Sequence, residues 1–198
     1  MTRKWMVLAL LAAFALAGEK EPKEPEKSPE KAPAFTLKDV DGKTRSLKDY
    51  EDKIVVLEWI NHGCPFVKKH YDAGHMQDLQ KTYTGKGVVW LSICSSAPGK
   101  QGHMSPEDWK RKNEGVKSKA TTVLIDEDGK VGRLYGAKTT PTMCIIGKKG
   151  VRIYQGAIDD SPFAKGEEIK KARCYVKEVL DAVLEGKEPP VTETKAYG

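Results

Sequence analysis

Cys64 is the residue of this sequence best placed to carry out chemistry. It stands in the segment NHGCPFVKKHY, residues 61–71, directly after the apolar run IVVLEWI of residues 54–60. An apolar run of this length followed by Cys-Pro predicts a buried strand that leads into a helix, with Cys64 at the helix N-terminus. The unsatisfied N–H groups and the dipole of a helix N-terminus favour a thiolate, the nucleophilic form of cysteine. We therefore expect Cys64 to be a reactive thiol rather than a small core residue.

The elements around this junction alternate between strand and helix patterns. Strands are indicated at residues 54–60, 87–96 and 121–126, with hairpins at 35–47, turning at Asp41–Gly42, and at 142–158. Helices are indicated over residues 64–83, 105–116, 131–136 and 166–186. Continuous apolar strands are typical of a sheet that is covered on both faces. The predicted fold is α/β, with a central mixed, mostly parallel sheet, helices on both faces and an N-terminal β-hairpin.

The N-terminus has the features of a targeting segment. Two basic residues, Arg3 and Lys4, precede an apolar run over residues 5–17 that ends in the small-residue site Ala15–Leu16–Ala17. This run is shorter than the roughly 20 residues that span a bilayer. It predicts a cleaved signal peptide, residues 1–17, and hence an exported protein, periplasmic or secreted, in which disulfide chemistry is available. A retained membrane anchor is the alternative.

The composition after the signal peptide divides the chain further. Residues 18–33 are rich in Lys, Glu and Pro and predict a disordered linker, residues 34–187 form one domain, and residues 188–198 are a C-terminal tail. Loss of residues 1–17 takes two basic residues from the formal charge of +6 and leaves +4. The remaining lysines are interspersed with acids, which argues against a nucleic-acid-binding surface.

Three separated motifs give the chain from about residue 34 to residue 185 a family resemblance. They are EWINHGCP at the strand-to-helix junction, IDEDGKVGRLYG before the last pair of strands, and TTPT followed by CIIGKKGVRIYQGAI. With these motifs the chain resembles the thioredoxin-like redoxins, the group that contains thioredoxin, cytochrome-maturation thiol reductases and peroxiredoxins. Within that group it is most similar to the alkyl hydroperoxide reductase and thiol-specific antioxidant type, as a single-cysteine CPFV variant.

The resemblance implies roles for the residues at the junction. Cys64 falls where thioredoxins place the first, nucleophilic cysteine of a two-cysteine motif, and Pro65 lies within that motif. Val67 occupies the place of the second cysteine. A mixed disulfide formed at Cys64 therefore has no neighbouring thiol at the usual position to resolve it.

The resemblance also implies a substrate-binding loop. Pro141 matches the cis-proline that lies against the nucleophile in this fold, and its neighbours Thr140 and Thr142 would hold the substrate strand with it. Glu58 matches a buried acid that shuttles a proton in thioredoxin. Burial inside an apolar strand disfavours a carboxylate, so we expect the pKa of Glu58 to rise toward working pH. Alternatively, strand curvature leaves Glu58 at an edge in water.

The sequence does not identify the thiol that would resolve a mixed disulfide at Cys64. Cys94 ends a strand that this fold would place parallel and adjacent to the strand leading to Cys64, which makes it the best internal partner, although a buried free cysteine is the other reading. Cys144 fits core packing, and Cys174 is expected beside the apolar stripe of the last helix, partly exposed. An external thiol, or a cysteine beyond Gly198, is the remaining choice.

Two further function classes compete with disulfide exchange. The first is thiol peroxidase-like antioxidant activity. Peroxiredoxins need a proline seven residues before their cysteine and a threonine or serine three residues before it. Here Leu57 and Asn61 occupy these two positions, so the usual peroxidase residues are missing. Copper-delivery proteins share the fold, and three histidines, His62, His70 and His75, lie near Cys64.

The helical spacing argues against a copper site at Cys64. His70 lies about 240° round the helix from Cys64, which makes it a surface or packing residue, while His62 is placed to tune the thiol. No metal ligands are predicted, and a redox-silent interaction module is the last alternative. The sequence therefore predicts an exported thiol–disulfide oxidoreductase with no cofactor beyond cysteine redox. Its expected partners are protein or small-molecule thiols and disulfides, with no nucleic acid and no stable membrane span after cleavage.

Overall fold

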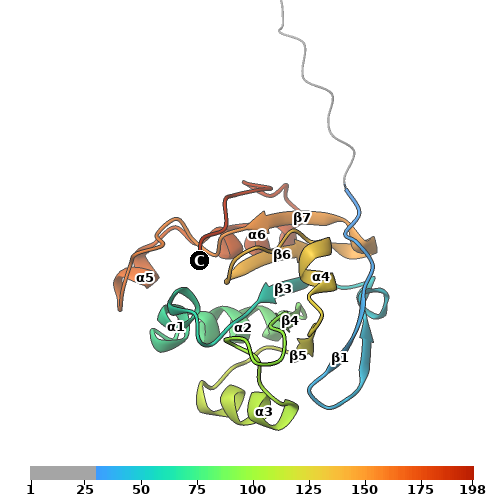
Figure 1. Ribbon diagram of the computed structural model, residues 1–198. Coiled ribbons are helices and arrows are strands. Elements are labelled where there is room, and N and C mark those ends of the chain that lie inside the picture. The colour runs from blue at the N-terminus through green and yellow to red at the C-terminus, as the bar shows by residue number, and fades with distance from the viewer. Residues whose placement is uncertain (1–29) are drawn as a thin grey trace, which may run out of the picture.

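The computed structural model describes residues 30–198 (Figure 1). The predicted signal peptide and residues 18–29 of the predicted linker lie outside the described residues. The strands are β1 (Thr36–Asp39), β2 (Thr44–Ser46), β3 (Val55–Trp59), β4 (Val89–Cys94), β5 (Thr122–Ile125), β6 (Thr142–Ile146) and β7 (Arg152–Gly156). The α-helices are α1 (Pro65–Asp72), α2 (His75–Gly85), α3 (Pro106–Gly115), α4 (Lys130–Leu134), α5 (Glu168–Lys171) and α6 (Tyr175–Leu184), and short 3-10 helices are η1 (Leu47–Tyr50) and η2 (Lys148–Gly150).

The strands form one mixed sheet in the order β2-β1-β5-β4-β3-β6-β7. Parallel pairing joins β3 to β4 and β4 to β5, where helices connect the strands. The pairs β1–β2, β1–β5, β3–β6 and β6–β7 are antiparallel. The predicted α/β fold with its N-terminal hairpin is confirmed, but in the described residues antiparallel pairs outnumber parallel ones, because two tight hairpins flank the parallel centre.

The alternation of side chains along β3 divides the core into two layers. Val56 and Ile60 pack in the cluster that contains the buried residues of α1, α2, α3 and α6. Val55, Leu57 and Trp59 pack in the second cluster, beneath η1 and α4. Figure 1 shows α1 and α2 on one side of β3 and α4 on the other. The sheet is therefore covered on both faces, with the long helices on one of them.

Two long helices predicted from the sequence are each broken in the structure. The helix expected over residues 64–83 ends at Asp72, and Gly74, at φ +72°, is the N-cap residue of α2. Glycine tolerates this left-handed conformation, which turns the chain between the two helices. The helix expected over 166–186 is interrupted after α5, because Ala172 is extended (φ −63°, ψ 151°). None of the helices among residues 30–198 has the length and apolar content to cross a membrane.

Segments at both ends of the described chain cover the outer edge of β7. Lys31 forms an antiparallel bridge with Val151, and the Ala32 N–H donates to Gly150 O at 2.9 Å. The end of the predicted linker thus belongs to the fold, because its backbone groups pair with this edge. The tail pairs further along, where Glu193 forms a parallel bridge with Gln155. An otherwise open strand edge is protected on both halves of β7.

Candidate active site

Cys64 lies at the junction of β3 and α1, as the sequence predicts. It is the N-cap residue of α1, with extended dihedral angles (φ −74°, ψ 127°), and Pro65 begins the helix. Pro65 suits this position because a first helical residue needs no N–H partner. The side chain of Cys64 makes no capping hydrogen bond; its thiol donates to the carbonyl of Thr140 at 3.1 Å. The sulfur is therefore aimed at the loop that precedes β6.

The loop before β6 contains the predicted cis-proline. The Thr140–Pro141 peptide bond is cis. Thr142 pairs with Trp59, so the start of β6 lies beside the end of β3, from which the Cys64 turn departs. The hydroxyl of Thr142 donates to Thr139 O at 2.7 Å and holds this loop. The structure thus brings together Cys64, Thr140 and Pro141, while the Thr142 side chain is engaged within the loop.

The first turn of α1 offers no second thiol. Val67, three residues after Cys64, is fully buried and packs in the core under α1.

The C-terminal tail reaches Thr140, the residue whose carbonyl contacts the Cys64 thiol. A Cβ atom built on Gly198 would clash with Thr140 O, so the backbone of Gly198 lies against the carbonyl that accepts the hydrogen bond from the Cys64 thiol. Figure 1 shows the C-terminus near α1.

A loop between β4 and α3 packs on the turn that carries Cys64, which the sequence did not reveal. The Asn61 side chain accepts from the Gly63 N–H at 2.7 Å and donates to Gln101 O at 3.3 Å. At Gly102, which has φ +89°, a Cβ atom would lie 2.5 Å from the Asn61 side chain. Gly102 is required there because no side chain fits between the loop and the turn. Asn61 is thereby fixed in a structural role.

Cys94 lies behind the same loop. Its thiol is 3.5 Å from Gly102 O, and only 2% of the residue is exposed. Burial raises the pKa of Cys94, which keeps it a poor nucleophile. Gly102 contacts the Asn61 side chain on one side and Cys94 on the other, so the loop lies against both the Cys64 turn and Cys94. The structure does not bond Cys94 to Cys64, and all four cysteines are free thiols.

The two remaining cysteines lie in the core. Cys144 is fully buried on the opposite layer of the sheet, and burial raises its pKa to about 12. Cys174 is the N-cap residue of α6 and is buried, where the sequence suggested partial exposure; burial raises its pKa to about 12 as well. Cys174 packs in the same core cluster as the buried residues of α6.

Glu58 is fully buried in the layer beneath α1 and α2, and not at an edge in water. Its carboxylate accepts hydrogen bonds from four buried side chains: Tyr71 Oη (3.0 Å), Gln80 Nε2 (3.1 Å), Trp90 Nε1 (2.7 Å) and Ser92 Oγ (3.0 Å). Burial raises the pKa of Glu58, and the four hydrogen bonds oppose the rise without cancelling it. The direction of the shift matches the sequence prediction.

The donors around Glu58 are themselves held in place. Gln80 Oε1 accepts from the Lys119 N–H at 2.8 Å and from Ser118 Oγ at 3.1 Å, which directs Nε2 toward Glu58. The same Nε2 donates to Tyr71 Oη at 3.0 Å. Because that hydroxyl is already an acceptor, it is oriented to donate to the carboxylate. Residues of the loop after α3 therefore hold Gln80, and Gln80 in turn orients Tyr71 toward Glu58.

His62 connects this network with the Cys64 turn by packing. Its ring lies edge-on to the ring of Tyr71 (4.9 Å between centroids) and 5.4 Å from that of Trp109. Burial, with a contribution from Lys112, lowers the pKa of His62 to about 4. The imidazole is neutral at pH 7, so it supplies no positive charge to the Cys64 thiol.

The histidines weighed as copper ligands separate into two places. His70 and His75 are buried, and their rings face each other with the two Nδ1 atoms 3.1 Å apart. They gather with Asp159 and not with Cys64 or His62. His70 is thus buried rather than on the surface, and the ligand set considered around Cys64 does not form.

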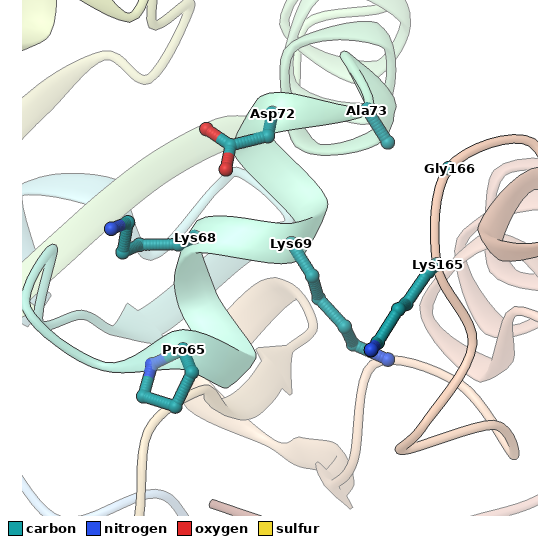
Figure 2. A pocket seen from close by; sticks show the side chains of 7 residues that line it. All are labelled: Pro65, Lys68, Lys69, Asp72, Ala73, Lys165 and Gly166. Carbon is teal, nitrogen blue, oxygen red and sulfur yellow. The ribbon is translucent and has the colours of Figure 1, made fainter.

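A pocket of about 410 Å³ opens beside Pro65 on the outer face of α1 (Figure 2). It is lined by Pro65, Lys68, Lys69, Asp72, Ala73, Lys165 and Gly166. Figure 2 shows the side chains of Lys69 and Lys165 reaching toward each other across the pocket. Lys69 Nζ donates to Ser161 O at 2.7 Å, and burial lowers its pKa. Three ammonium groups against one carboxylate give the pocket a positive charge.

Fold and site together define a thioredoxin-like redox protein. A thiol at a helix N-terminus, after the central strand β3, faces the residue before a cis-proline at the start of β6. The AhpC/TSA family model matches residues 29–154, and the chain belongs to this family. It is also 27% identical over 142 residues to the thiol-disulfide oxidoreductase ResA of Bacillus thuringiensis subsp. konkukian, an alignment that covers 71% of this chain and 70% of that protein.

Two solved structures are similar over most of their length. An uncharacterized conserved protein from Geobacillus kaustophilus is 31% identical, with a TM-score of 0.70 over 84% of this chain and 86% of that one. A hypothetical protein from Sinorhizobium meliloti 1021 is 22% identical, with a TM-score of 0.73 over 88% of this chain and 93% of that one. The second comparison supports the fold alone.

Proposed function

We propose that the protein is an exported thiol–disulfide oxidoreductase in which Cys64 is the single nucleophile. The observation that carries the proposal is the 3.1 Å contact between the Cys64 thiol and Thr140 O, next to the cis peptide bond of Pro141. Similarity to ResA supports the reaction class. Export is inferred from residues 1–17, and sequencing of the mature N-terminus tests it: a protein that retains Met1 would contradict cleavage.

The reaction begins with loss of the Cys64 proton. In the thiol form Cys64 donates a hydrogen bond to Thr140 O, so the thiolate must turn away from that carbonyl. In the first turn of α1 the donor it can face is the Phe66 N–H, because Pro65 has no N–H and the Val67 and Lys68 N–H groups donate to Cys64 O. The thiolate then attacks one sulfur of a substrate disulfide. A bond forms from Cys64 Sγ to that sulfur, the substrate S–S bond breaks, and the other sulfur leaves as a thiolate that takes up a proton.

Glu58 is the group we assign to proton transfer in this reaction. Its raised pKa brings it closer to neutrality than an ordinary carboxyl, which a group that exchanges protons at working pH requires. Its partner Tyr71 packs against His62, two residues before Cys64. The buried network therefore extends from the carboxyl to the base of the Cys64 turn.

The mixed disulfide at Cys64 is resolved, in this proposal, by a low-molecular-weight thiol from solution. Val67 leaves the usual position without a thiol, and Cys94 is buried with a raised pKa. The attacking thiolate forms a disulfide with the substrate sulfur, and Cys64 leaves as a thiolate. The lysine-lined pocket beside Pro65 favours thiols that carry carboxylates, such as glutathione, because opposite charges attract there.

A thiol-exchange assay with a glutathione-labelled peptide as substrate tests the proposal. Cys64→Ser should abolish transfer, whereas Cys174→Ser, which removes a buried thiol at the start of α6, should retain it. Hydrogen peroxide as a second substrate separates the alternative class. A wild-type protein that consumes peroxide but does not exchange disulfides would replace this proposal by thiol peroxidase activity, and exchange that persists in Cys64→Ser would refute it.

A further inference from the structure

A buried polar cluster joins four segments that are distant in the sequence. It comprises His70 on α1, His75 at the start of α2, Asp159 in the segment after β7 and Tyr197 in the tail. His70, His75 and Asp159 are each exposed by 9% or less. One ligand atom from each of these three lies within 4.8 Å of the other two. The proposed exchange reaction uses none of the four residues.

The hydrogen bonds within the cluster leave one group without a partner. Tyr197 Oη donates to Asp159 Oδ1 at 2.6 Å and lies 3.1 Å from His70 Nε2. The other carboxylate oxygen, Asp159 Oδ2, is buried with no hydrogen-bond partner and lies 3.8 Å from His70 Nε2. A buried carboxylate oxygen without a partner is costly, and coordination of a cation is one way to satisfy it.

We infer that His70, His75 and Asp159 form a binding site for a divalent transition-metal ion, for which Zn²⁺ is the probe, with the Tyr197 hydroxyl as a further oxygen ligand. Two imidazoles and a carboxylate are a ligand set that zinc accepts. The set contains no thiolate, so it does not favour Cu(I). This site is distinct from the ligand set around Cys64 that the sequence suggested.

The geometry of the cluster suits such an ion. Donor atoms around tetrahedral zinc, with bonds of about 2.0–2.2 Å, are about 3.4 Å apart. The three donor atoms here lie within 4.8 Å of one another, so they would have to move closer together around a bound ion. The rings of His70 and His75 already face each other with their Nδ1 atoms 3.1 Å apart, so two nitrogen donors lie close together.

The ion would fasten the tail over α1. The Tyr197 ring packs 5.8 Å from that of Phe66, two residues after Cys64, and the next residue, Gly198, lies against Thr140. Bonds from one ion to α1, α2 and the tail would hold these contacts together. The expected consequence is a tail that is protected from carboxypeptidase when the metal is bound.

The experiment is a Zn²⁺ titration of chelator-treated protein against a chromophoric competitor, with Co²⁺ absorption as the signature of nitrogen and oxygen ligands. The Cys64→Ser background removes zinc binding by that thiol, which also makes the result independent of exchange activity. We expect one ion per chain with submicromolar affinity. His75→Gln and Asp159→Asn should each weaken it by more than the roughly 10- to 100-fold typical of changes outside the ligand shell.

The matched control is His103→Gln. His103 lies beside the exposed Glu127 (3.2 Å), away from the cluster, and its loss should leave the affinity unchanged. Circular dichroism checks that each variant is folded, and Asp159→Asn preserves the shape of the side chain. A Cys64→Ser protein that binds no stoichiometric zinc at micromolar concentration would overturn the inference. So would an affinity that neither ligand variant changes.

Discussion

Replacement of Glu58 by glutamine tests the buried network, because it removes the ionisable group and keeps its size. The two acceptor atoms of the wild-type carboxylate receive four donors. Trp90 and Gln80 can only donate, so the amide oxygen of the variant must face them at the Oε2 position. The amide nitrogen then meets Tyr71 Oη, which loses its acceptor. One unsatisfied buried donor costs about 1–3 kcal/mol of the free energy of unfolding, at any pH.

The wild-type protein carries a second cost that depends on pH. Burial raises the pKa of Glu58 in the folded state, while the unfolded chain ionises near about 4.3. Below that pH both states are protonated, and the wild-type protein has its full stability. Above it only the unfolded state ionises, so wild-type stability falls by about 1.4 kcal/mol per pH unit until the folded carboxyl ionises too. Glu58→Gln has no such loss.

Urea unfolding between pH 4 and pH 8, followed by tryptophan fluorescence, measures the difference between Glu58→Gln and wild type. The variant should be about 1–3 kcal/mol less stable at pH 4, and the gap should narrow as the pH rises above about 4.3. The exposed Glu188→Gln provides the baseline for a surface change. A gap that stays constant or widens as the pH rises would show that Glu58 is ionised in the folded state, and the reasoning would be wrong.

The other predictions concern the fate of the Cys64 adduct. Val67→Cys should shorten the lifetime of a glutathione adduct on Cys64 by at least about 10-fold, measured by mass spectrometry, because it places a thiol in the same helical turn; Val67→Ala is the control, and an unchanged lifetime would contradict the geometry. Cys94→Ser should leave that lifetime as in wild type, and a longer one would identify Cys94 as the resolving thiol. Lys165→Glu should slow release of the adduct by glutathione about two- to ten-fold at low salt, with Lys43→Glu in the β1–β2 hairpin as control. Equal release rates in Lys165→Glu and wild type would show that the pocket does not attract glutathione.

The sequence was sufficient for features that depend on local pattern or on a family motif. The apolar run before Cys64 and the Cys-Pro dipeptide predict the strand, the helix start and the position of the thiol at their junction. The cis bond at Pro141 followed from resemblance and not from local sequence. The break at Gly74 was missed because an isolated glycine within a helical pattern does not specify a left-handed turn.

The contacts that tune the site could not be predicted, since they depend on strand register and loop packing. Ser92 reaches Glu58 because the two residues are paired across β3 and β4, and this register appears only when the sheet is assembled. Gly102 reaches the Asn61 side chain through a loop whose path the sequence does not state. Asp159 carried no signal at all, because a lone acid after a strand resembles any turn residue.

The helix α1 serves both buried networks with neighbouring residues. His70 and Tyr71 are consecutive, and consecutive residues project about 100° apart on a helix. Tyr71 therefore faces Glu58 under the sheet-facing side of α1, while His70 faces His75 and the tail. The two networks share α1, but the side chains of His70 and Tyr71 are not hydrogen-bonded to each other. Tyr71→Phe would therefore remove one hydrogen bond to the Glu58 carboxyl without removing a metal ligand. If zinc still changes the reactivity of the Cys64 thiol in Tyr71→Phe, the effect does not depend on the hydrogen bond from Tyr71 to Glu58. It would then act through the position of α1 and of the tail against Thr140.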